Sequence, residues 1–572
     1  MRSNAGTSAV AVLLVVGVGC IGSIGAPGVP AGSGNGPPGN SGSGNNGVGN
    51  GGGGVGGIGT TPGDPNAAGP MPLLRLTHSE YNNTVRDLLG DTSNPANAFP
   101  LDRDPEFLYR RVGLASLQDV DTMKDAAKAL GKVAETKATT LAPCPSGMAE
   151  DACARAFITS FGLRAYRRPL ATDESDRLVA LYSVGRTMLT LNYAGAIGLL
   201  VEGMLQSPAF LYHWELGNNL PTVEGSVIKL GPYENASRLS YFMYSSMPDQ
   251  ALFDAAAANK LGTQAELEAQ ARRMLADPKS AETVSRFAEE WLNLDQVAER
   301  PKDPAVYPEF VDGLKAAMSA ETRAFVNSVM KGDQRLSSLL TANNATVTQP
   351  VAAIYGVSGV SGTAATAAML NPAQRSGLLT RASFLTVTGA TDGSNPVKRG
   401  RRIYERLLCN ELPPPPNDVP TVASATDSAG KTTRQRFEDH DRNKCAIACH
   451  GVMDKLGYAF ENYDGIGRFR TMDNGGNVDA SGSVDLDGAT VAFGNALDLS
   501  KALAGSRNAA NCFATQWFRF AVKRTEIDAD LASLNAIAGA FSKANSIGDL
   551  MVGVAASRSF RYRTPGTGEM LK

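Results

Sequence analysis

Two cysteines and a histidine lie within six residues in the C-terminal half of the chain. Cys445 and Cys449 are separated by three residues, and His450 directly follows the second cysteine. Covalent haem attachment uses this combination, because two thiols bond to the haem vinyl groups and the adjacent imidazole becomes an axial iron ligand. The usual spacing is one residue shorter, but positions four apart share a helix face, as positions three apart do. The motif therefore predicts covalent haem c, with His450 as proximal ligand.

Two other interpretations of this motif remain open. A short-range disulfide between Cys445 and Cys449 would leave His450 incidental, and a metal site would use the same side chains without haem. No second cysteine–histidine pair of the zinc-finger type accompanies the motif in the sequence. The chain holds only four histidines, so a histidine beside a cysteine pair is unexpected by chance.

A haem at this position leaves the other face of the iron open to a second ligand. His440 lies ten residues before His450, upstream of both cysteines, so the chain there can pass round the haem edge. Met472 and Met551 are alternatives, and an open or water-bound position is another. Met453 lies three residues after His450, on the same local turn, so it cannot easily cross to the far side of the haem. We therefore expect His440 as the sixth ligand.

Residues 1–20 have the features of an export signal. One positive charge, Arg2, precedes an apolar run at residues 9–18 that is too short to span a bilayer. The run ends before Cys20, in a context that resembles a bacterial lipoprotein cleavage site. Signal cleavage near residues 25–26 without lipidation is the alternative. We expect a lipid on Cys20 and a periplasmic or cell-surface location, as an outer-membrane lipoprotein in contact with the membrane through its lipid anchor only.

The stretch that follows, residues 21–70, is rich in Gly, Pro, Asn and Ser. It has almost no large apolar side chains, so it cannot bury a core, and we expect it to be a flexible tether. The formal net charge of the whole chain is −2. This charge shows no electrostatic footprint for nucleic acid, so we expect no nucleic-acid partner.

Four cysteines remain outside the signal peptide and the haem motif, an even number that suits two disulfides in an oxidising compartment. Cys144 and Cys153 are nine positions apart and flank a loop with Pro and Gly, which allows closure. Cys409 and Cys512 then pair by elimination. The second bridge would tie the segment before the proline run at 413–416 to the C-terminal helices.

Capping signals and apolar periodicity predict helices along most of the remaining chain. Thr77 and Glu80 form a capping-box signature before a helix expected at 78–89, and a second box begins at Thr263. Residues 469–493 are rich in Gly, Asp and Val with local alternation, and they predict one or two short β-hairpins. The sequence thus predicts a mainly α fold.

Several short motifs occur in a set order from about residue 73 onward. They are Glu80-Tyr81-Asn82-Asn83-Thr84-Val85-Arg86-Asp87-Leu88-Leu89, Arg164-Ala165-Tyr166-Arg167-Arg168-Pro169-Leu170, Gln206-Ser207-Pro208-Ala209-Phe210-Leu211-Tyr212, Ala236-Ser237-Arg238-Leu239-Ser240-Tyr241-Phe242 and the stretch 457–468. In these motifs the chain resembles the large multi-domain proteins with cytochrome-c-like modules first described from planctomycetes and also abundant in myxobacteria. The resemblance implies export, a mostly helical body and a cytochrome-c-like, haem-binding module, and it supplies no reaction.

These features together divide the chain into expected domains. The expected boundaries are 1–20 for the signal peptide, 21–70 for the tether, 71–135 for an N-terminal helical domain, 136–218 for a helical domain with Cys144 and Cys153, 219–350 for a further helical domain, 370–450 for the cytochrome-c-like segment with the proline run, and 451–572 for a C-terminal domain. The expected fold is a multi-domain helical body with a cytochrome-c-like module and a short hairpin region at 469–493.

Three classes of function agree with this organisation. The first is an exported c-type haem protein for electron transfer, serving an extracellular oxidative step through a redox partner that the sequence does not identify. The second is a haem-free, disulfide-stapled surface binding or scaffold protein. The third is an enzyme associated with polysaccharide degradation, although the chain lacks a nucleophile elbow. Glu289 and Glu290 do not qualify as a catalytic pair, because adjacent helix residues point in different directions. The sequence assigns no catalytic residue.

Overall fold

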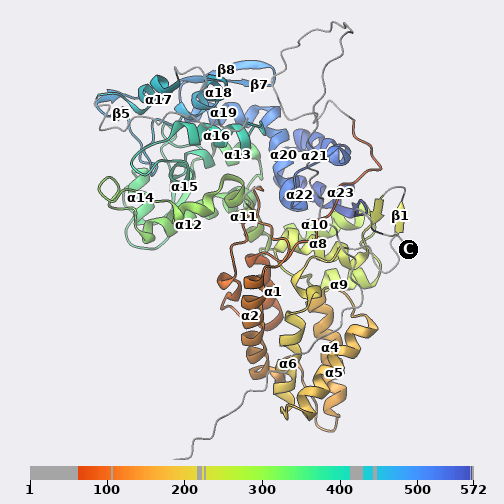
Figure 1. Ribbon diagram of the computed structural model, residues 1–572. Helices are drawn as coiled ribbons and strands as arrows, with labels where there is room; N and C mark the ends of the chain where they lie inside the picture. Colours follow the sequence, from red (N-terminus) through yellow and green to blue (C-terminus); the bar gives the residue numbers. More distant parts are fainter. Residues whose placement is uncertain are drawn as a thin grey trace, which may run out of the picture. The chain divides into compact units, whose positions relative to one another are not determined.

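Helices dominate the part of the chain that the structure describes (Figure 1). The computed structural model describes residues 62–104, 107–215, 222–224, 227–412, 430–441, 447–566 and 569. The α-helices are α1 (His78–Leu89), α2 (Leu117–Thr136), α3 (Ala138–Leu141), α4 (Glu150–Tyr166), α5 (Thr172–Thr187), α6 (Tyr193–Leu205), α7 (Pro208–Leu211), α8 (Pro232–Tyr244), α9 (Gln250–Ala257), α10 (Gln264–Leu275), α11 (Ser280–Leu292), α12 (Asp312–Lys331), α13 (Leu336–Thr341), α14 (Gln349–Tyr355), α15 (Ala382–Val387), α16 (Pro396–Arg406), α17 (Thr433–Asp441), α18 (Ile447–Tyr458), α19 (Ala496–Gly505), α20 (Arg507–Val522), α21 (Leu531–Ala544), α22 (Ile547–Ala556) and α23 (Arg558–Arg561). Short 3-10 helices are η1 (Pro95–Ala98), η2 (Leu294–Glu299), η3 (Leu378–Thr380) and η4 (Asp528–Asp530).

The strands are short and form small antiparallel sheets. They are β1 (Thr222–Glu224), β2 (Val227–Lys229) and β9 (Tyr562–Arg563) in one sheet, β3 (Asn344–Val347) with β4 (Thr366–Met369), β5 (Met472–Asp473) with β6 (Gly476–Asn477), and β7 (Gly482–Leu486) with β8 (Ala489–Phe493). The last two pairs confirm the hairpins predicted at 469–493. The sheet that joins β2 to β9 was not predicted, because its strands are only a few residues long and more than three hundred positions apart.

The first helix has the bounds predicted from its capping signals. The Thr77 hydroxyl accepts from the Glu80 backbone N–H, and the Glu80 carboxylate accepts from the Thr77 N–H at 2.9 Å. Gly90 ends the helix in the left-handed region, with φ at 63°, which glycine adopts without a steric penalty. The second capping box, at Thr263, also forms. These two helix starts are therefore determined locally.

Two hydrophobic cores hold most of the described helices together. The first lies among α1, α2, α4, α5 and α6. There α2 and α6 approach closely through Gly131 and Gly198, since a Cβ on either glycine would lie within 3 Å of the other's carbonyl oxygen. The second core joins α8–α12 to α20–α22. At its centre the rings of Phe287 in α11 and Trp517 in α20 stack at 3.7 Å between centroids.

The folded body begins earlier in the chain than the sequence indicates. Residues 62–70 were expected to belong to the tether, but Ala68 is fully buried and the Pro70 carbonyl accepts from Arg524 at 2.6 Å. The Asn66 carbonyl likewise accepts from Arg558 at 2.9 Å. The small side chains of this segment let it lie directly against the C-terminal helices. A segment without large apolar residues is therefore packed at the edge of the folded body and is not part of the tether. The signal peptide, Cys20 and the rest of the tether lie outside the described residues.

Two expected domain boundaries fall within helices. The boundary between residues 450 and 451 lies inside α18, and the boundary at residue 350 lies inside α14. A helix is continuous through its hydrogen bonds, so neither position is a linker. Among the described residues, none of the helices has both the length and the hydropathy that a bilayer crossing requires.

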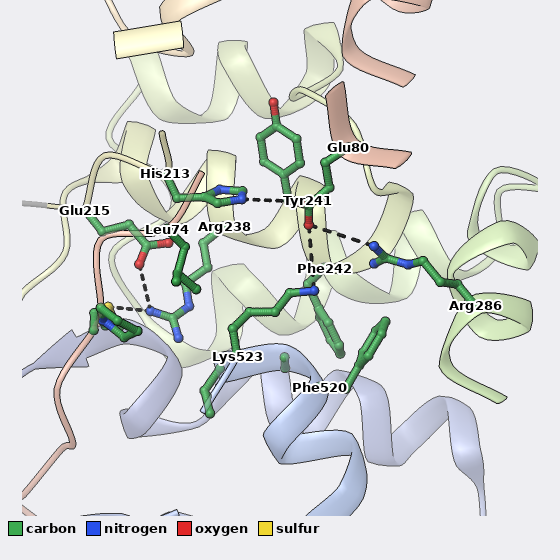
Figure 2. A pocket seen from close by; sticks show the side chains of 14 residues that line it. Leu74, Glu80, His213, Glu215, Arg238, Tyr241, Phe242, Arg286, Phe520 and Lys523 are labelled. Carbon is green, nitrogen blue, oxygen red and sulfur yellow. Dashed lines mark hydrogen bonds and ion pairs between the residues drawn. The ribbon is translucent and has the colours of Figure 1, made fainter. Parts of the chain in front are cut away.

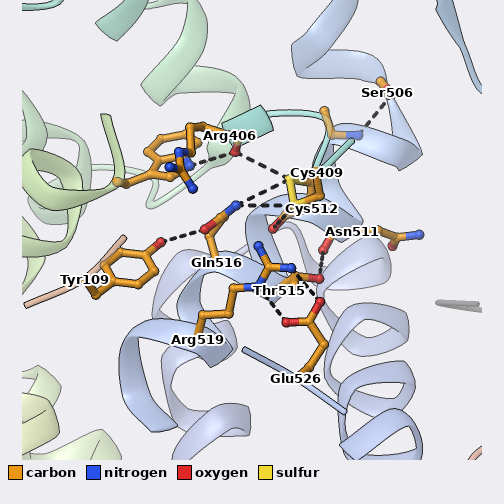
Figure 3. The surroundings of a disulfide bond; sticks show 12 residues. Tyr109, Arg406, Cys409, Ser506, Asn511, Cys512, Thr515, Gln516, Arg519 and Glu526 are labelled. Carbon is orange, nitrogen blue, oxygen red and sulfur yellow. Dashed lines mark hydrogen bonds and ion pairs between the residues drawn. A yellow bond between two sulfur atoms is a disulfide. The ribbon is translucent and has the colours of Figure 1, made fainter. Parts of the chain in front are cut away.

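Both predicted disulfides are present in the structure. Cys144 pairs with Cys153, and Cys409 pairs with Cys512, with Cα atoms 5.4 and 5.3 Å apart. The second bridge is buried between the end of α16 and α20, where Gln516 donates towards the Cys409 sulfur at 3.3 Å (Figure 3). Because this bond links residues 103 positions apart, it should stabilise the fold by about 2–5 kcal/mol in the chain-entropy picture.

Helices α16 and α18 pack closely enough to require glycine at their crossing. A Cβ on Gly400 would lie 1.7 Å from the Met453 carbonyl oxygen, and one on Gly457 would lie 1.8 Å from the Pro396 carbonyl oxygen. Both obstacles are backbone atoms, which cannot rotate away. This contact fixes the helix in which Cys449 and His450 lie.

Gly457→Ala should therefore destabilise the protein by about 1–3 kcal/mol or more, since the helices must separate to admit one methyl group. Gly539→Ala is the matched control, because Gly539 is also helical and nothing lies within 4 Å of an added Cβ. The control should stabilise by about 0.5–1 kcal/mol through helix propensity. Urea unfolding followed by circular dichroism measures both. Equal stabilities for the two variants would contradict the close crossing.

Candidate functional site

The cysteine–histidine motif is only partly within the described residues. Cys445 lies outside them, in the segment 442–446. Cys449 and His450 lie in the first turn of α18, and His440 lies near the end of α17, and for these three the structure describes the backbone. Cys449 and His450 thus lie at the start of one helix, and His440 lies near the end of the preceding one.

Helices α17 and α18 form an antiparallel pair. The guanidinium of Arg434, in the first turn of α17, lies 4.8 Å from the ring centroid of Tyr458, the last residue of α18. The two helices contact each other and are joined by the short segment 442–446. Consequently the end of α17 that carries His440 and the start of α18 that carries His450 lie at the same end of the pair.

The remaining turns of α18 are held on several sides. Met453, Leu456 and Tyr458 are buried, with at most 5% of each exposed. The helix packs against α16 through the glycine crossing and against β7, where a Cβ on Gly482 would lie 3.0 Å from the Lys455 carbonyl oxygen. The first turn of α18 therefore extends from a rigidly supported helix.

The two arginines that follow α18 form ion pairs of their own, and the alternative sixth ligands Met472 and Met551 lie elsewhere in the fold. Arg468 pairs with Asp464 at 2.8 Å, and Arg470 pairs with Asp473 at 2.6 Å. Met472 is half exposed in β5, next to a carboxylate that accepts from the Thr433 N–H at the start of α17. It thus lies near the far end of α17 from His440. Met551 is fully buried in α22 among α10, α20 and α21, so its side chain already serves the core.

A second site is a buried pocket that sequence reasoning did not find. Glu80 at the start of α1 contacts His213 at 3.2 Å, and Lys523 and Arg286 approach the same carboxylate at 3.8 and 3.9 Å (Figure 2). Beside them Arg238 of α8 pairs with Glu215 at 3.3 Å and also contacts the sulfur of Met71. The polar groups surround a cavity of about 40 Å³. That volume holds a few water-sized groups and is far too small for haem.

Burial and neighbouring charges act in opposite directions on the acids and bases of this pocket. Burial alone raises the pKa of Glu80, but Lys523, His213 and Arg286 outweigh it and hold that pKa well below its ordinary value. Burial lowers the pKa of Lys523, against the opposing effect of Glu80. Burial also raises the pKa of Glu290, which lies behind Arg286 at 3.8 Å. Glu80 is consequently the firmly ionised centre of the cluster.

Glu289 and Glu290 point to different partners, as expected for adjacent helix residues. Glu289 pairs with Arg323 at 2.6 Å, whereas Glu290 accepts from the Arg110 backbone N–H at 2.8 Å. They do not form a carboxylate pair.

The sequence contains little that points to the buried pocket. Glu80 is part of a capping box, which explains it without a pocket, and His213 is one of four histidines. Arg286 and Lys523 carry no local sequence signal.

The fold and the disulfides define the class of protein: it is a mainly α, multi-domain chain whose described residues include short β-hairpins and two disulfide bonds. Five family models match it in succession. They are Protein of unknown function (DUF1587) at residues 75–135, Protein of unknown function (DUF1595) at 153–215, Protein of unknown function (DUF1592) at 230–357, Protein of unknown function (DUF1588), named PSCyt3, at 375–473, and Protein of unknown function (DUF1585) at 490–560.

These five domains are typical of planctomycete-type multi-domain proteins. The name PSCyt3 hints at cytochrome-like character for residues 375–473, which include the whole cysteine–histidine motif. No curated protein and no solved structure matches the chain. The pocket draws Glu80, His213, Arg286 and Lys523 from four different matched domains.

Proposed function

We propose that the protein is an exported c-type haem protein that transfers electrons and serves an oxidative step outside the cytoplasm. One observation carries the proposal: the Cys445–Cys449–His450 motif leads into α18, a helix fixed by its packing on α16, within the domain named PSCyt3. A ligand on a rigid helix keeps its position when the redox state changes. The name of the domain supports a cytochrome-like role for this segment.

The residues present fit covalent haem. Cys445 and Cys449 would hold the group through thioether bonds, and His450 would hold the iron. Bound haem supplies one-electron redox chemistry at this position. The helix α18 contributes orientation, because its buried residues fix the direction in which its first turn extends.

The experiment that tests this function is a visible spectrum of the denatured protein. The chain is produced in cells with a haem-c maturation system and purified under denaturing conditions, which removes any haem that is not covalently bound. We expect a Soret band and a polypeptide mass increased by one haem. A bare polypeptide mass, in cells that mature a standard c-type cytochrome, would instead favour the haem-free scaffold that the two disulfides stabilise.

His440 is the sixth ligand in this proposal, since the antiparallel α17–α18 pair brings its backbone to the end where α18 begins. His440→Ala should convert a low-spin spectrum into a high-spin one while the haem stays covalently attached. Met472→Ala is the matched control and should leave the spin state unchanged, because Met472 lies near the opposite end of α17. An unchanged spectrum for His440→Ala, or a change for Met472→Ala only, contradicts the assignment.

The proposal also includes export and a lipid anchor on Cys20. The proposed partner is a redox protein, and no nucleic acid is proposed as a partner. Its support is the apolar run before Cys20 in the sequence. Cys20→Ser should move the protein from the membrane fraction of the cell into the soluble fraction, because the lipid is the only proposed membrane contact. Cys144→Ser serves as control and should leave fractionation unchanged. Membrane retention of Cys20→Ser would exclude the anchor.

A further inference from the structure

The pocket between α1, α8, α11 and the end of α20 contains hydrogen-bond donors that no described group satisfies. The Nε and one Nη of Arg286 and the Nε of Arg238 are buried and have no hydrogen-bond acceptor among the described residues. Only 5% of Arg286 and 7% of Arg238 is exposed. Burying an N–H of a charged group without an acceptor costs more than burying a neutral one, so such donors point to a missing acceptor.

The charges that line the pocket also indicate that a negatively charged group is missing from it. Arg238, Arg286 and Lys523 contribute three positive charges, whereas Glu80 and Glu215 contribute two negative ones. Glu215 pairs with Arg238, so Glu80 is the one carboxylate of the lining that Arg286, Lys523 and His213 share. Figure 2 shows the Lys523 ammonium and the Arg286 guanidinium approaching that carboxylate from different sides. The lining thus carries one more positive than negative charge, and the nearest further carboxylate is Glu290, which lies outside the lining at 3.8 Å from the Arg286 Nε.

Other groups of the protein contact Arg286 and Lys523 but satisfy only some of their hydrogen-bond donors. Arg286 lies over the Phe520 ring at 5.0 Å, and its Nη1 contacts the Ser79 hydroxyl at 3.2 Å. Glu290 lies 3.8 Å from the Arg286 Nε, but its own buried oxygen there also lacks a hydrogen-bond donor, so the two do not form a hydrogen bond. The Lys523 ammonium approaches the Arg110 carbonyl oxygen at 3.5 Å. These contacts leave the free Arg286 and Arg238 donors without acceptors.

We propose that this pocket binds a small oxyanion, a phosphate-sized ion or the carboxylate of a small acid, through Arg286, Arg238 and Lys523. The cavity of about 40 Å³ admits a group of a few heavy atoms. Guanidinium groups bind oxyanions in a fork geometry with charge-assisted hydrogen bonds. Because its lining comes from four of the matched domains, a bound oxyanion also joins these domains. The site is separate from the cysteine–histidine motif and does not depend on haem.

Isothermal titration calorimetry of the full chain tests the proposal. Inorganic phosphate, acetate and succinate are titrated separately at constant ionic strength maintained with chloride. We expect saturable binding of one ion per chain for at least one of them. Binding of phosphate alone identifies a phosphate site, and binding of acetate or succinate identifies a carboxylate site. The absence of saturable binding for all three overturns the proposal.

Variants assign the binding to this pocket. Lys523→Gln should weaken binding about ten- to hundredfold, the equivalent of one charge-assisted hydrogen bond. Arg286→Lys keeps the charge and removes the fork, and it should weaken binding similarly, whereas Arg286→Met should abolish it. Arg177→Gln, an exposed cation on α5, is the control and should bind like the wild type. Near-UV circular dichroism verifies that each variant is folded. Wild-type affinity in folded Lys523→Gln and Arg286→Lys overturns the assignment.

Discussion

Replacing both Cys445 and Cys449 by serine should abolish covalent haem, so that the denatured protein shows no Soret band and has the mass of the bare polypeptide. The thioether bonds need both sulfurs, and the hydroxyl of serine does not add to the haem vinyl groups. Absorbance and intact mass under denaturing conditions measure the loss. Each single variant should keep at most one thioether and give a lower yield of holoprotein.

The control for this experiment is the double variant Cys144→Ser with Cys153→Ser, which also removes a cysteine pair from the exported chain. Its disulfide lies outside the matched domain that contains the motif, so haem attachment should persist. Peptide mapping of the wild type without reduction provides a second measurement. A disulfide between Cys445 and Cys449, with no haem on either cysteine, would contradict the prediction and support the haem-free alternative.

Glu321→Ala should destabilise the protein by about 3–5 kcal/mol, because it leaves the buried guanidinium of Arg381 without its counter-ion. The two side chains are each 1% exposed and lie 2.6 Å apart. Tyr355 also donates to the Glu321 carboxylate at 2.9 Å, and the Arg381 guanidinium lies 3.8 Å from the Phe325 ring centroid. Loss of Glu321 thus removes the charge partner from the middle of a packed core between α12 and α15.

The matched control for this variant is Asp173→Ala, which breaks the exposed pair with Arg177 in α5. An exposed ion pair contributes about 0–1 kcal/mol, so the control should unfold close to the wild type. Urea titrations followed by circular dichroism compare the first unfolding transition of each variant, since a multi-domain chain need not unfold in one step. Equal shifts for the two variants would show that the Glu321–Arg381 pair does not support the core.

Local sequence patterns determined much of the secondary structure. The capping box at Thr77 and Glu80 fixed α1, because its hydrogen bonds join residues three apart. Alternation and turn residues predicted the hairpins of 469–493. Counting cysteines gave both disulfides, one across a short loop and one by elimination. The haem motif stays a prediction from the sequence, because Cys445 lies outside the described residues and the structure describes only the backbone of Cys449 and His450.

Only the tertiary structure decided which distant residues meet. Residues 62–70 lie against the C-terminal helices, although the composition of this segment predicts a tether. Strand β2 pairs with β9 in the folded chain. Lys523 likewise approaches the carboxylate of Glu80, although the two residues are more than four hundred positions apart. The physical reason is the range of the interactions. Helix caps and hairpins depend on neighbours a few residues apart, whereas a buried charged pocket depends on how whole helices pack, and no local pattern records that packing.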